Sequence, residues 1–231
     1  MSSDYEYVKK NLDELTEELS ALAASVGREK ITLVCVTKSG SDEELTALVR
    51  AGASDIGENR PQELRRRGEL LRAEGLTPTL HEIGNLQRKN VKLIINDVAL
   101  IHSLDSIELA AEIDKRAAAI GRKIPVLAEI NSGREENKGG ILPECAEDFC
   151  AEIGRFESLE LCGLMTMGPA LDDPELMRPY FKLTKEIFDK LKENGAFVGE
   201  PILSMGMSDS YRVAIEEGAT LVRIGRRLFQ K

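Results

Sequence analysis

The chain has 231 residues, of which 42% are hydrophobic, and this size and composition fit one domain with a packed core. Lys and Arg number 31 against 40 Asp and Glu, and a net charge of −9 argues against nucleic acid as a partner. The N-terminus lacks a signal-peptide pattern and no apolar run approaches the about 20 residues that span a bilayer, so we expect a cytoplasmic protein with no membrane partner.

The first predicted element is a helix over residues 4–26, in which Val8, Leu12, Leu15, Leu19 and Leu22 recur at helical spacing. A short run rich in β-branched residues then predicts a strand over residues 31–37. The sequence Ser-Asp-Glu-Glu at 41–44 is a capping-box pattern and predicts the start of a helix that continues through residue 50. The alternation repeats to the end of the chain, and seven further strands are predicted at residues 53–58, 79–84, 99–104, 124–131, 159–167, 201–207 and 220–225.

Eight strands with seven intervening helices and one helix in front indicate right-handed crossovers and a parallel sheet. In a chain of this length, eight repeats predict an α/β fold, a single (β/α)8 TIM barrel over residues 1–231. The extra N-terminal helix would take the place of the eighth helix, because only a short tail follows the last strand. A doubly wound open sheet is the alternative. In a barrel, functional residues belong at the carboxyl ends of the strands.

Clusters of basic residues and the cysteines give no sign of a basic groove or a metal site. The basic residues at 65–67 and 88–89 lie among glutamates and are expected on solvated helix faces. With only two histidines in the chain and no metal-ligand spacing among its cysteines, we expect no metal site. The four cysteines are Cys35, Cys145, Cys150 and Cys162.

The first two strands each end next to a polar residue that a barrel would place at its mouth. Lys38 follows the first strand, where low-dielectric walls disfavour a charged ammonium and a neutral amine can form a Schiff base with an aldehyde. An ordinary solvated lysine is the alternative. Asn59 follows the second strand and would bring an amide to the rim, or else cap the helix that begins at Pro61. His81 is placed near the start of its strand and is expected to be structural.

The residues at the ends of the last two strands fit a phosphate site, because barrels often bind phosphate in the loops after strands seven and eight. Ser204 and Ser208 offer hydroxyl groups there, and Gly225 and Arg226 offer backbone N–H groups. Helix caps and tight turns are the alternative interpretation of these residues. Arg223 alternates with outward-facing apolar neighbours, so we expect it to face the mouth, where a ring nitrogen or a carboxylate would accept its hydrogen bond.

A Schiff-base lysine, an arginine and a phosphate site in one mouth fit pyridoxal 5′-phosphate (PLP), an aldehyde joined to a phosphate through a ring. Six short motifs stand at the predicted strand ends: Val-Thr-Lys at 36–38, Gly-Glu-Asn at 57–59, His-x-Ile-Gly at 81–84 with Gln87, Gly-Leu-Met-Thr-Met at 163–167, Met-Gly-Met-Ser-Asp at 205–209 and Val-Arg-Ile-Gly at 222–225.

In these motifs the chain resembles the PLP homeostasis proteins, single-barrel relatives of the N-terminal barrel of alanine racemase. The resemblance implies that Lys38 carries PLP covalently, that Ser204, Ser208, Gly225 and Arg226 surround the phosphate, and that Arg223 approaches the pyridine nitrogen. Asn59 and Met205 complete the expected cofactor site.

Several positions depart from the pattern of that family without removing an expected cofactor contact. The dipeptide Arg60-Pro61 replaces an aromatic-aliphatic pair, and Glu82 stands where Phe is frequent. Ser210 replaces a second Asp and Gln230 a closing Gly, while Lys-Asn at 89–90 inverts the common order.

The resemblance favours a carrier, which binds PLP and buffers it or delivers it to the apo forms of PLP-dependent enzymes, over a catalyst. The alternatives are a PLP-dependent amino-acid racemase or decarboxylase, and a barrel isomerase that acts on a phosphorylated metabolite without a cofactor. Racemisation needs a second base opposite the lysine, which the racemases supply as a Tyr from a further β-domain. The chain ends six residues after Gly225, so we expect no such domain, no catalytic residues and a monomer. None of the four tyrosines is expected opposite Lys38: Tyr5, Tyr7, Tyr180 and Tyr211.

Overall fold

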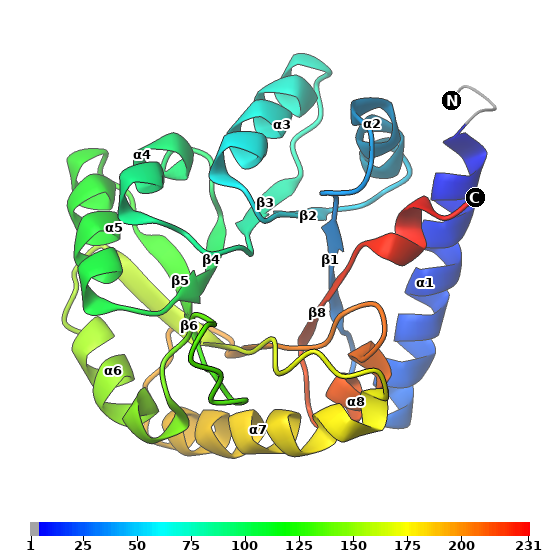
Figure 1. Ribbon diagram of the computed structural model, residues 1–231. Coiled ribbons are helices and arrows are strands. Elements are labelled where there is room, and N and C mark those ends of the chain that lie inside the picture. Colours follow the sequence, from blue (N-terminus) through cyan, green and yellow to red (C-terminus); the bar gives the residue numbers. More distant parts are fainter. Residues whose placement is uncertain (1–4) are drawn as a thin grey trace.

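The fold is a closed parallel barrel, seen end-on in Figure 1. The computed structural model describes residues 5–231, and within them eight strands pair in chain order, with β1 hydrogen-bonded to both β2 and β8. The predicted (β/α)8 barrel is confirmed, and the closure between β1 and β8 excludes the open sheet. The strands are β1 (Thr32–Val36), β2 (Asp55–Glu58), β3 (Thr79–Glu82), β4 (Leu100–Leu104), β5 (Ile124–Glu129), β6 (Leu159–Met165), β7 (Ile202–Ser204) and β8 (Leu221–Ile224).

Helices surround the barrel and alternate with the strands. The predicted capping box begins α2, where the Ser41 hydroxyl accepts from the Glu44 N–H and the Glu44 carboxylate accepts from the Ser41 N–H. The described residues also form short 3-10 turns, of which three lead directly into α4, α6 and α7 and one follows β8: η2 (Arg88–Asn90), η3 (Pro143–Cys145), η4 (Pro174–Met177) and η5 (Arg226–Phe229). The α-helices are α1 (Glu6–Ser25), α2 (Asp42–Arg50), α3 (Pro61–Ala73), α4 (Val91–Ile94), α5 (Ile107–Ala119), α6 (Ala146–Ile153), α7 (Arg178–Glu193) and α8 (Tyr211–Glu216).

Each predicted strand is present, but the observed strands are shorter than the apolar runs that predicted them. The run at 124–131 ends as a strand at Glu129, and the run at 159–167 ends at Met165. Ile130 and Thr166 continue these runs and are almost fully buried, although they lie beyond the strands. Their N–H groups still donate to the Met165 and Ser204 carbonyl oxygens, at 2.8 and 3.1 Å, so single backbone hydrogen bonds continue just past the regular strands.

The helix α1 packs on the barrel through one apolar face. It begins at Glu6, and the predicted start at Asp4 lies outside the described residues. Leu22 is only half-buried, and Ala23 takes its place on the buried face. The buried residues of α1 are Val8, Leu12, Leu15, Leu19 and Ala23.

Polar contacts hold α1 where an eighth outer helix would lie, next to η5 and α8 (Figure 1). The Asn11 side-chain amide donates to the carbonyl oxygens of Leu228, at 3.2 Å, and of Gln230, at 2.7 Å. Glu18 forms ion pairs of 2.7 Å with Arg227 and 2.5 Å with Arg212. The N-terminal helix thus completes the outer layer, as predicted.

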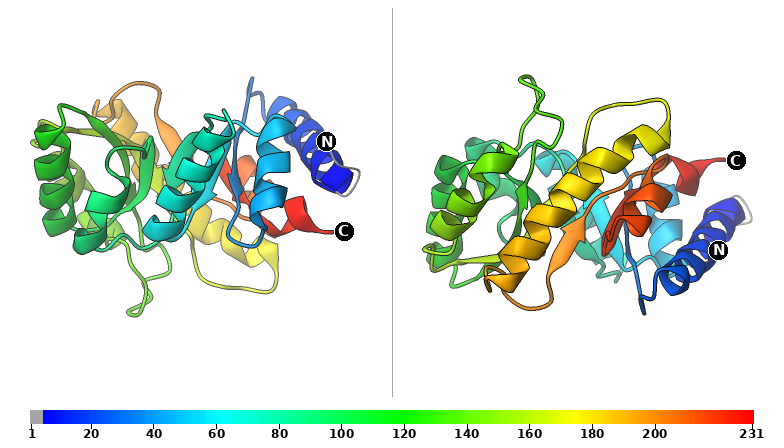
Figure 2. Two further views of the ribbon diagram at one scale, coloured as in Figure 1. Left: turned by 90° about the horizontal axis from the view of Figure 1, so that it is seen from above. Right: turned by 90° about the horizontal axis from the view of Figure 1, so that it is seen from below.

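The segments after β5 and β6 project beyond the same end of the barrel, as the side views in Figure 2 show. Parallel pairing places the carboxyl ends of all eight strands at this end. The expected functional residues therefore share one mouth. No helix within residues 5–231 is both long and apolar enough to cross a membrane.

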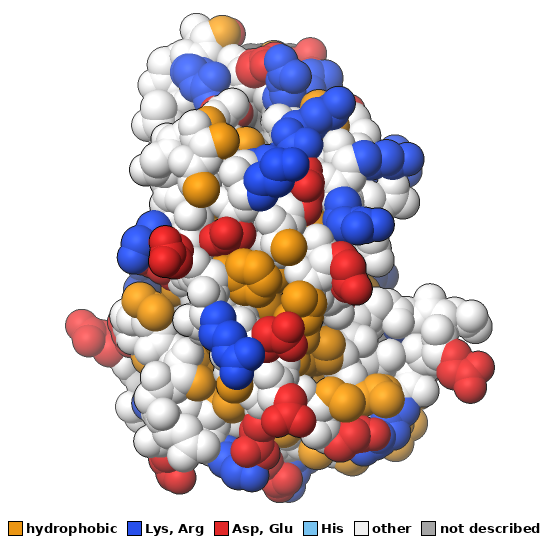
Figure 3. Space-filling model, turned by 90° about the vertical axis from the view of Figure 1, so that its left-hand side faces the viewer, with side chains coloured by type: hydrophobic (Ala, Val, Ile, Leu, Met, Phe, Trp, Pro, Cys, Tyr) orange, Lys and Arg blue, Asp and Glu red, His pale blue; other side chains and the backbone are white. Residues whose placement is uncertain are grey.

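The surface charges are mixed, and Figure 3 shows acidic and basic side chains around a small apolar group on the face over α4 to α6. On α3, Arg65 and Arg66 are exposed, as expected, and pair with Glu69 at 2.9 Å and Asp42 at 2.6 Å. Arg67 is different: only 7% of it is exposed. The prediction of a solvated face is wrong for this residue because its guanidinium is needed beneath the end of β1.

Candidate functional site

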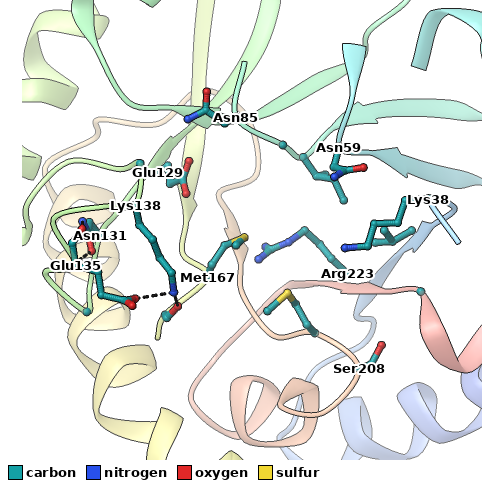
Figure 4. Close-up of a pocket in the computed structure, with 18 of the residues that line it drawn as sticks. Lys38, Asn59, Asn85, Glu129, Asn131, Glu135, Lys138, Met167, Ser208 and Arg223 are labelled. Atoms are coloured by element: carbon teal, nitrogen blue, oxygen red, sulfur yellow. Dashed lines mark hydrogen bonds and ion pairs between the residues drawn. The ribbon is translucent and has the colours of Figure 1, made fainter. Parts of the chain in front are cut away.

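A cavity of about 790 Å³ opens at the carboxyl end of the barrel. Figure 4 shows Lys38 from the end of β1 and Arg223 from β8 directed toward the same space, with Asn59 and Ser208 beside them. The structure therefore brings together residues from both ends of the sequence. Six of the eight predicted binding residues line this cavity: Lys38, Asn59, Ser208, Arg223, Gly225 and Arg226.

The other two residues, Ser204 and Met205, are fully buried and do not line the cavity. Ser204 lies inside the barrel, where its hydroxyl contacts His102 at 3.0 Å and accepts from Arg223 Nη1 at 2.5 Å. We expected this hydroxyl to face a phosphate, and the structure corrects that expectation. Ser204 pairs with Leu221 across β7 and β8, so it lies deeper in the barrel than Arg223, which is two residues closer to the mouth on β8. Ser204 supports Arg223 instead.

The turn that carries Lys38 is fixed from behind by a buried ion pair. Arg67 Nη1 donates to the Thr37 carbonyl at 2.5 Å and to Glu58 Oε1 at 2.6 Å, and Nη2 donates to the Gly40 carbonyl at 2.7 Å. The Thr37 hydroxyl also donates to Glu58. Since Thr37 and Gly40 flank Lys38, these bonds set the direction in which its backbone enters the cavity.

Lys38 itself is exposed to the cavity. Within residues 5–231, no carboxylate lies within 4.0 Å of its ammonium. Lys138, from the opposite wall, differs because its ammonium is paired with Glu135 at 2.7 Å and donates to the Gly168 carbonyl at 3.3 Å (Figure 4). Of these two lysines, only Lys38 offers an amine without a carboxylate partner among the described residues.

Arg223 lies where β8 meets the cavity, as the alternation of its neighbours predicted. Its Nη2 donates to the Thr166 carbonyl at 3.0 Å, so two nitrogens of the guanidinium are tied to the barrel. Burial lowers the pKa of Arg223 to about 10, and the nearby Glu129 opposes this effect. The guanidinium remains a cation at neutral pH, with its remaining N–H groups available to the cavity.

The loops after β7 and β8 form the side of the cavity that was predicted to hold a phosphate. Gly206 has φ of +93°, and a Cβ there would lie 2.6 Å from the Ala214 Cβ, so this turn requires glycine. Ser208, Gly225 and Arg226 line the cavity beyond it. The Arg226 guanidinium is paired with Asp209, a contact that the sequence interpretation did not foresee.

Glu129 is a functional candidate that the sequence interpretation did not assign. It lines the cavity at the end of β5, where burial raises its pKa to about 7, nearby Asp105 adds to the rise and Arg223 opposes it. The direction of Glu129 follows from Leu127, two residues earlier on the same strand, which packs inside the barrel against Leu100. Because side chains two apart on a strand share a face, Glu129 points inward as well.

None of the four tyrosines, all within the described residues, lines the cavity. The hydroxyl of Tyr211 donates to Glu18 on the outer surface of the barrel. Tyr7 likewise donates to Glu44 of α2. No group within residues 5–231 gathers three His, Cys, Asp or Glu side chains that could hold a metal ion.

The departures from the family pattern lie around the cavity rather than in it. Pro61 begins α3 directly after Arg60, and the Ser210 hydroxyl accepts from the Met207 N–H at 3.3 Å. Glu82 is fully buried; one carboxylate oxygen accepts from the Gly84 N–H and the other has no partner within the described residues. Burial raises the pKa of Glu82 to about 8, the Gly84 N–H opposes the rise, and Glu58 adds to it.

Comparison with known proteins matches this chain over nearly its whole length. Residues 11–230 fit the family model of the alanine racemase N-terminal domain. The pyridoxal phosphate homeostasis protein of Aquifex aeolicus is 41% identical over 206 residues, which cover 89% of each chain.

Solved structures agree with these matches. A protein of unknown function from Bifidobacterium adolescentis superposes with a TM-score of 0.88 at 33% identity, covering 99% of this chain and 97% of that one. PipY of Synechococcus elongatus, solved with PLP bound, superposes with a TM-score of 0.83 at 24% identity, covering 96% of this chain and all of that one. The chain therefore belongs to the alanine racemase N-terminal domain family, among the relatives that are named pyridoxal phosphate homeostasis proteins.

Proposed function

We propose that this chain binds PLP covalently through Lys38 and serves PLP homeostasis as a carrier rather than as a catalyst. The observation that carries the proposal is the convergence of Lys38, Arg223 and the loops after β7 and β8 on one cavity, which brings together an amine, a guanidinium, a hydroxyl and a second cation. Support also comes from the relatives named for PLP homeostasis and from the PLP-bound structure of PipY.

The donor set of the cavity fits the three parts of PLP. The bound cofactor would supply an aldehyde, which bonds to a neutral amine with loss of water. Lys38 places the amino group for this bond in the cavity, and no carboxylate among residues 5–231 is paired with it. Ser208, Gly225 and Arg226 would hold the phosphate through a hydroxyl, a backbone close to the cavity and a cation. Asn59 adds an amide at the rim.

A carrier role is supported by the charge at Arg223. A guanidinium beside the pyridine nitrogen disfavours protonation of that nitrogen, and an unprotonated ring is a poor sink for electrons. Among the described residues no tyrosine lines the cavity, so residues 5–231 supply no second base of the kind that the racemases use. Apo forms of PLP-dependent enzymes are the recipients that we propose.

The test of covalent attachment is an absorption spectrum of the purified chain with PLP, before and after borohydride, followed by peptide mass mapping. We expect a visible band that is lost on reduction and a stable adduct on the peptide that contains Lys38. Lys38→Ala should abolish the adduct, whereas Lys138→Ala, which removes the paired lysine of the same cavity, should keep it. A chain that stays colourless with added PLP, or an adduct that survives Lys38→Ala, refutes the proposal.

The carrier proposal is tested separately from binding. Once the adduct is mapped, racemase and decarboxylase assays with a panel of amino acids should show no turnover above free PLP. Mixing the loaded chain with an apo-enzyme should transfer the cofactor and restore the activity of that enzyme. Multiple turnovers of an amino acid by the loaded chain, lost in Lys38→Ala, would replace the carrier by the enzyme alternative.

A further inference from the structure

Five polar side chains form one chain of hydrogen bonds across the interior of the barrel, from β2 to β8. Asp55 Oδ1 lies 3.1 Å from His81 Nε2, and His81 Nδ1 lies 2.9 Å from His102 Nε2. His102 Nδ1 lies 3.0 Å from the Ser204 hydroxyl, which lies 2.5 Å from Arg223 Nη1. The chain thus joins the lower barrel to the arginine that faces the cavity.

This polar chain lies almost wholly out of contact with solvent. His102 and Ser204 have no exposed surface and 4% of His81 is exposed. Buried polar groups destabilise a fold unless each finds a partner. Each ring nitrogen of the two histidines does find one, so the arrangement is fully hydrogen-bonded along its length.

The two charged ends determine where the protons lie. Hydrogen bonds from His81 and Ser54 hold the pKa of Asp55 below its ordinary value, although burial acts in the opposite direction. Burial, together with His81 and Arg223, holds the pKa of His102 well below its ordinary value, so this imidazole is neutral. A carboxylate can only accept and a guanidinium can only donate.

A single direction of donation satisfies these conditions. His81 donates from Nε2 to Asp55, so its Nδ1 accepts from Nε2–H of His102. His102 Nδ1 then carries no proton and accepts from the Ser204 hydroxyl. The hydroxyl proton being committed, the lone pairs of Ser204 are left to accept from Arg223.

The opposite direction requires an additional proton inside the barrel. If His102 carried its proton on Nδ1, its Nε2 would have to accept from Nδ1–H of His81. His81 would then need a second proton on Nε2, or else present a bare nitrogen to the Asp55 carboxylate. Neutral His102 with its proton on Nε2 avoids both costs.

We propose that His102 is a positioning residue for Arg223, acting through Ser204, and that this chain holds the guanidinium where it keeps the ring nitrogen of bound PLP unprotonated. The role of Arg223 toward PLP rests on the proposed function, but the proton arrangement does not. His81 and Asp55 fix the tautomer of His102, which fixes the orientation of the Ser204 hydroxyl. The Thr166 carbonyl is the second restraint on the guanidinium.

The first test reads the proton arrangement in the chain without PLP. Two-bond proton–nitrogen correlation spectra of uniformly ¹⁵N-labelled protein assign the tautomer of each of its two histidines. We expect a neutral His102 ring with its proton on Nε2 at neutral pH, and a proton on Nε2 of His81. A proton on Nδ1 of His102, or a charged ring at that residue, overturns the proposal whether or not PLP binds.

The second test uses PLP labelled with ¹⁵N in its ring. In the unaltered chain we expect the shift of an unprotonated pyridine. His102→Leu and Ser204→Ala should move this shift toward that of a pyridinium at the same pH. The first variant frees the Ser204 hydroxyl to rotate and the second removes it, so in both the Thr166 carbonyl is the remaining fixed partner of Arg223. Ser103→Ala is the matched control, since Ser103 is adjacent on β4, buried, and has no hydrogen-bond partner within the described residues.

Two conservative variants separate positioning from a general role in folding. An asparagine can place an oxygen near the position of Nδ1, so His102→Asn should keep the bond to Ser204 and the unprotonated ring signal. His102→Gln reaches only toward His81 and should give the signal of His102→Leu. Equal ring shifts in Ser204→Ala, His102→Asn, His102→Gln and the unaltered chain overturn the inference. Failure of the unaltered chain to bind PLP refutes the proposed function and the role toward PLP, and leaves the tautomer test standing.

Discussion

Arg67→Met removes the guanidinium behind the Lys38 turn and keeps much of the apolar side chain. Glu58, with 2% of its surface exposed, would then be a buried carboxylate with only the Thr37 hydroxyl as a side-chain donor. The carbonyl oxygens of Thr37 and Gly40 would also lose their bonds to the guanidinium. Breaking one side of a buried ion pair costs about 3–5 kcal/mol, a large part of the about 5–15 kcal/mol that stabilises a typical fold.

The coupling between Arg67 and Glu58 is measured by a double-mutant cycle in urea, with unfolding followed by circular dichroism. Glu58→Gln alone should cost about 1–3 kcal/mol, because its amide oxygen can still accept from Arg67. The double variant Arg67→Met/Glu58→Gln should be less destabilised than the sum of the single variants by about 1–3 kcal/mol, since it leaves no buried charge.

Arg65→Met is the matched control on the same helix. Arg65 is exposed and pairs with Glu69 at the surface, so its loss should change the free energy of unfolding by less than about 0.5 kcal/mol. If Arg67→Met cost no more than Arg65→Met, or if the cycle were additive within about 0.5 kcal/mol, the assignment of Arg67 as a buried support would be refuted.

Three further predictions concern stability. Burial raises the pKa of Glu82 to about 8, so the folded chain retains a proton that the unfolded chain releases. The free energy of unfolding should therefore fall as pH rises above 4.5, the ordinary pKa of Glu, by up to about 1.4 kcal/mol per pH unit. Urea midpoints at pH 5 and 8 should show a smaller fall in Glu82→Gln, and an equal fall in the variant would disprove the prediction. Gly206→Ala should lower the melting temperature more than Gly52→Ala, because both have positive φ but only Gly206 has Ala214 within 4 Å of a new Cβ; equal losses would show that backbone strain alone matters. Leu15→Ala should cost about 2–5 kcal/mol in urea unfolding because Leu15 is fully buried under α1, and a loss below about 1 kcal/mol would mean that α1 docks only loosely.

The barrel was predictable because its strands combine β-branched residues with burial on both faces. The segment Thr32–Val36 is one such strand, and the polar capping box at Ser41 marks the next helix. Strand ends were less predictable, since Ile130 and Thr166 are buried without belonging to a strand. An apolar run in the sequence predicts which residues are buried, whereas the residue at which a strand ends depends on how far the adjacent strand pairs with it.

The cavity was partly predictable because Lys38 and Asn59 follow their strands directly. Ser204 was assigned to the wrong contact, since a serine at a strand end and a serine four residues later resemble each other until the β7–β8 register is known. The link between His81 and His102 was equally hidden, because the sequence shows two isolated histidines. The β3–β4 register, which pairs His81 with Leu100, brings the two rings together.

The two buried ionic systems support adjacent strands at the same mouth. Arg67 and Glu58 lie outside the barrel and fix the turn after β1, whereas Arg223 and its hydrogen-bonded partners lie inside and restrain β8, the strand paired with β1. Replacing a buried ion pair by well-packed apolar residues often leaves the stability of a fold unchanged or raises it, so stability alone does not explain these charges. Their location is better explained by geometry. An amine on the Lys38 turn and a guanidinium at Arg223 can engage one small molecule only if the relative position of the two strand ends is fixed, and each ionic system fixes one of them.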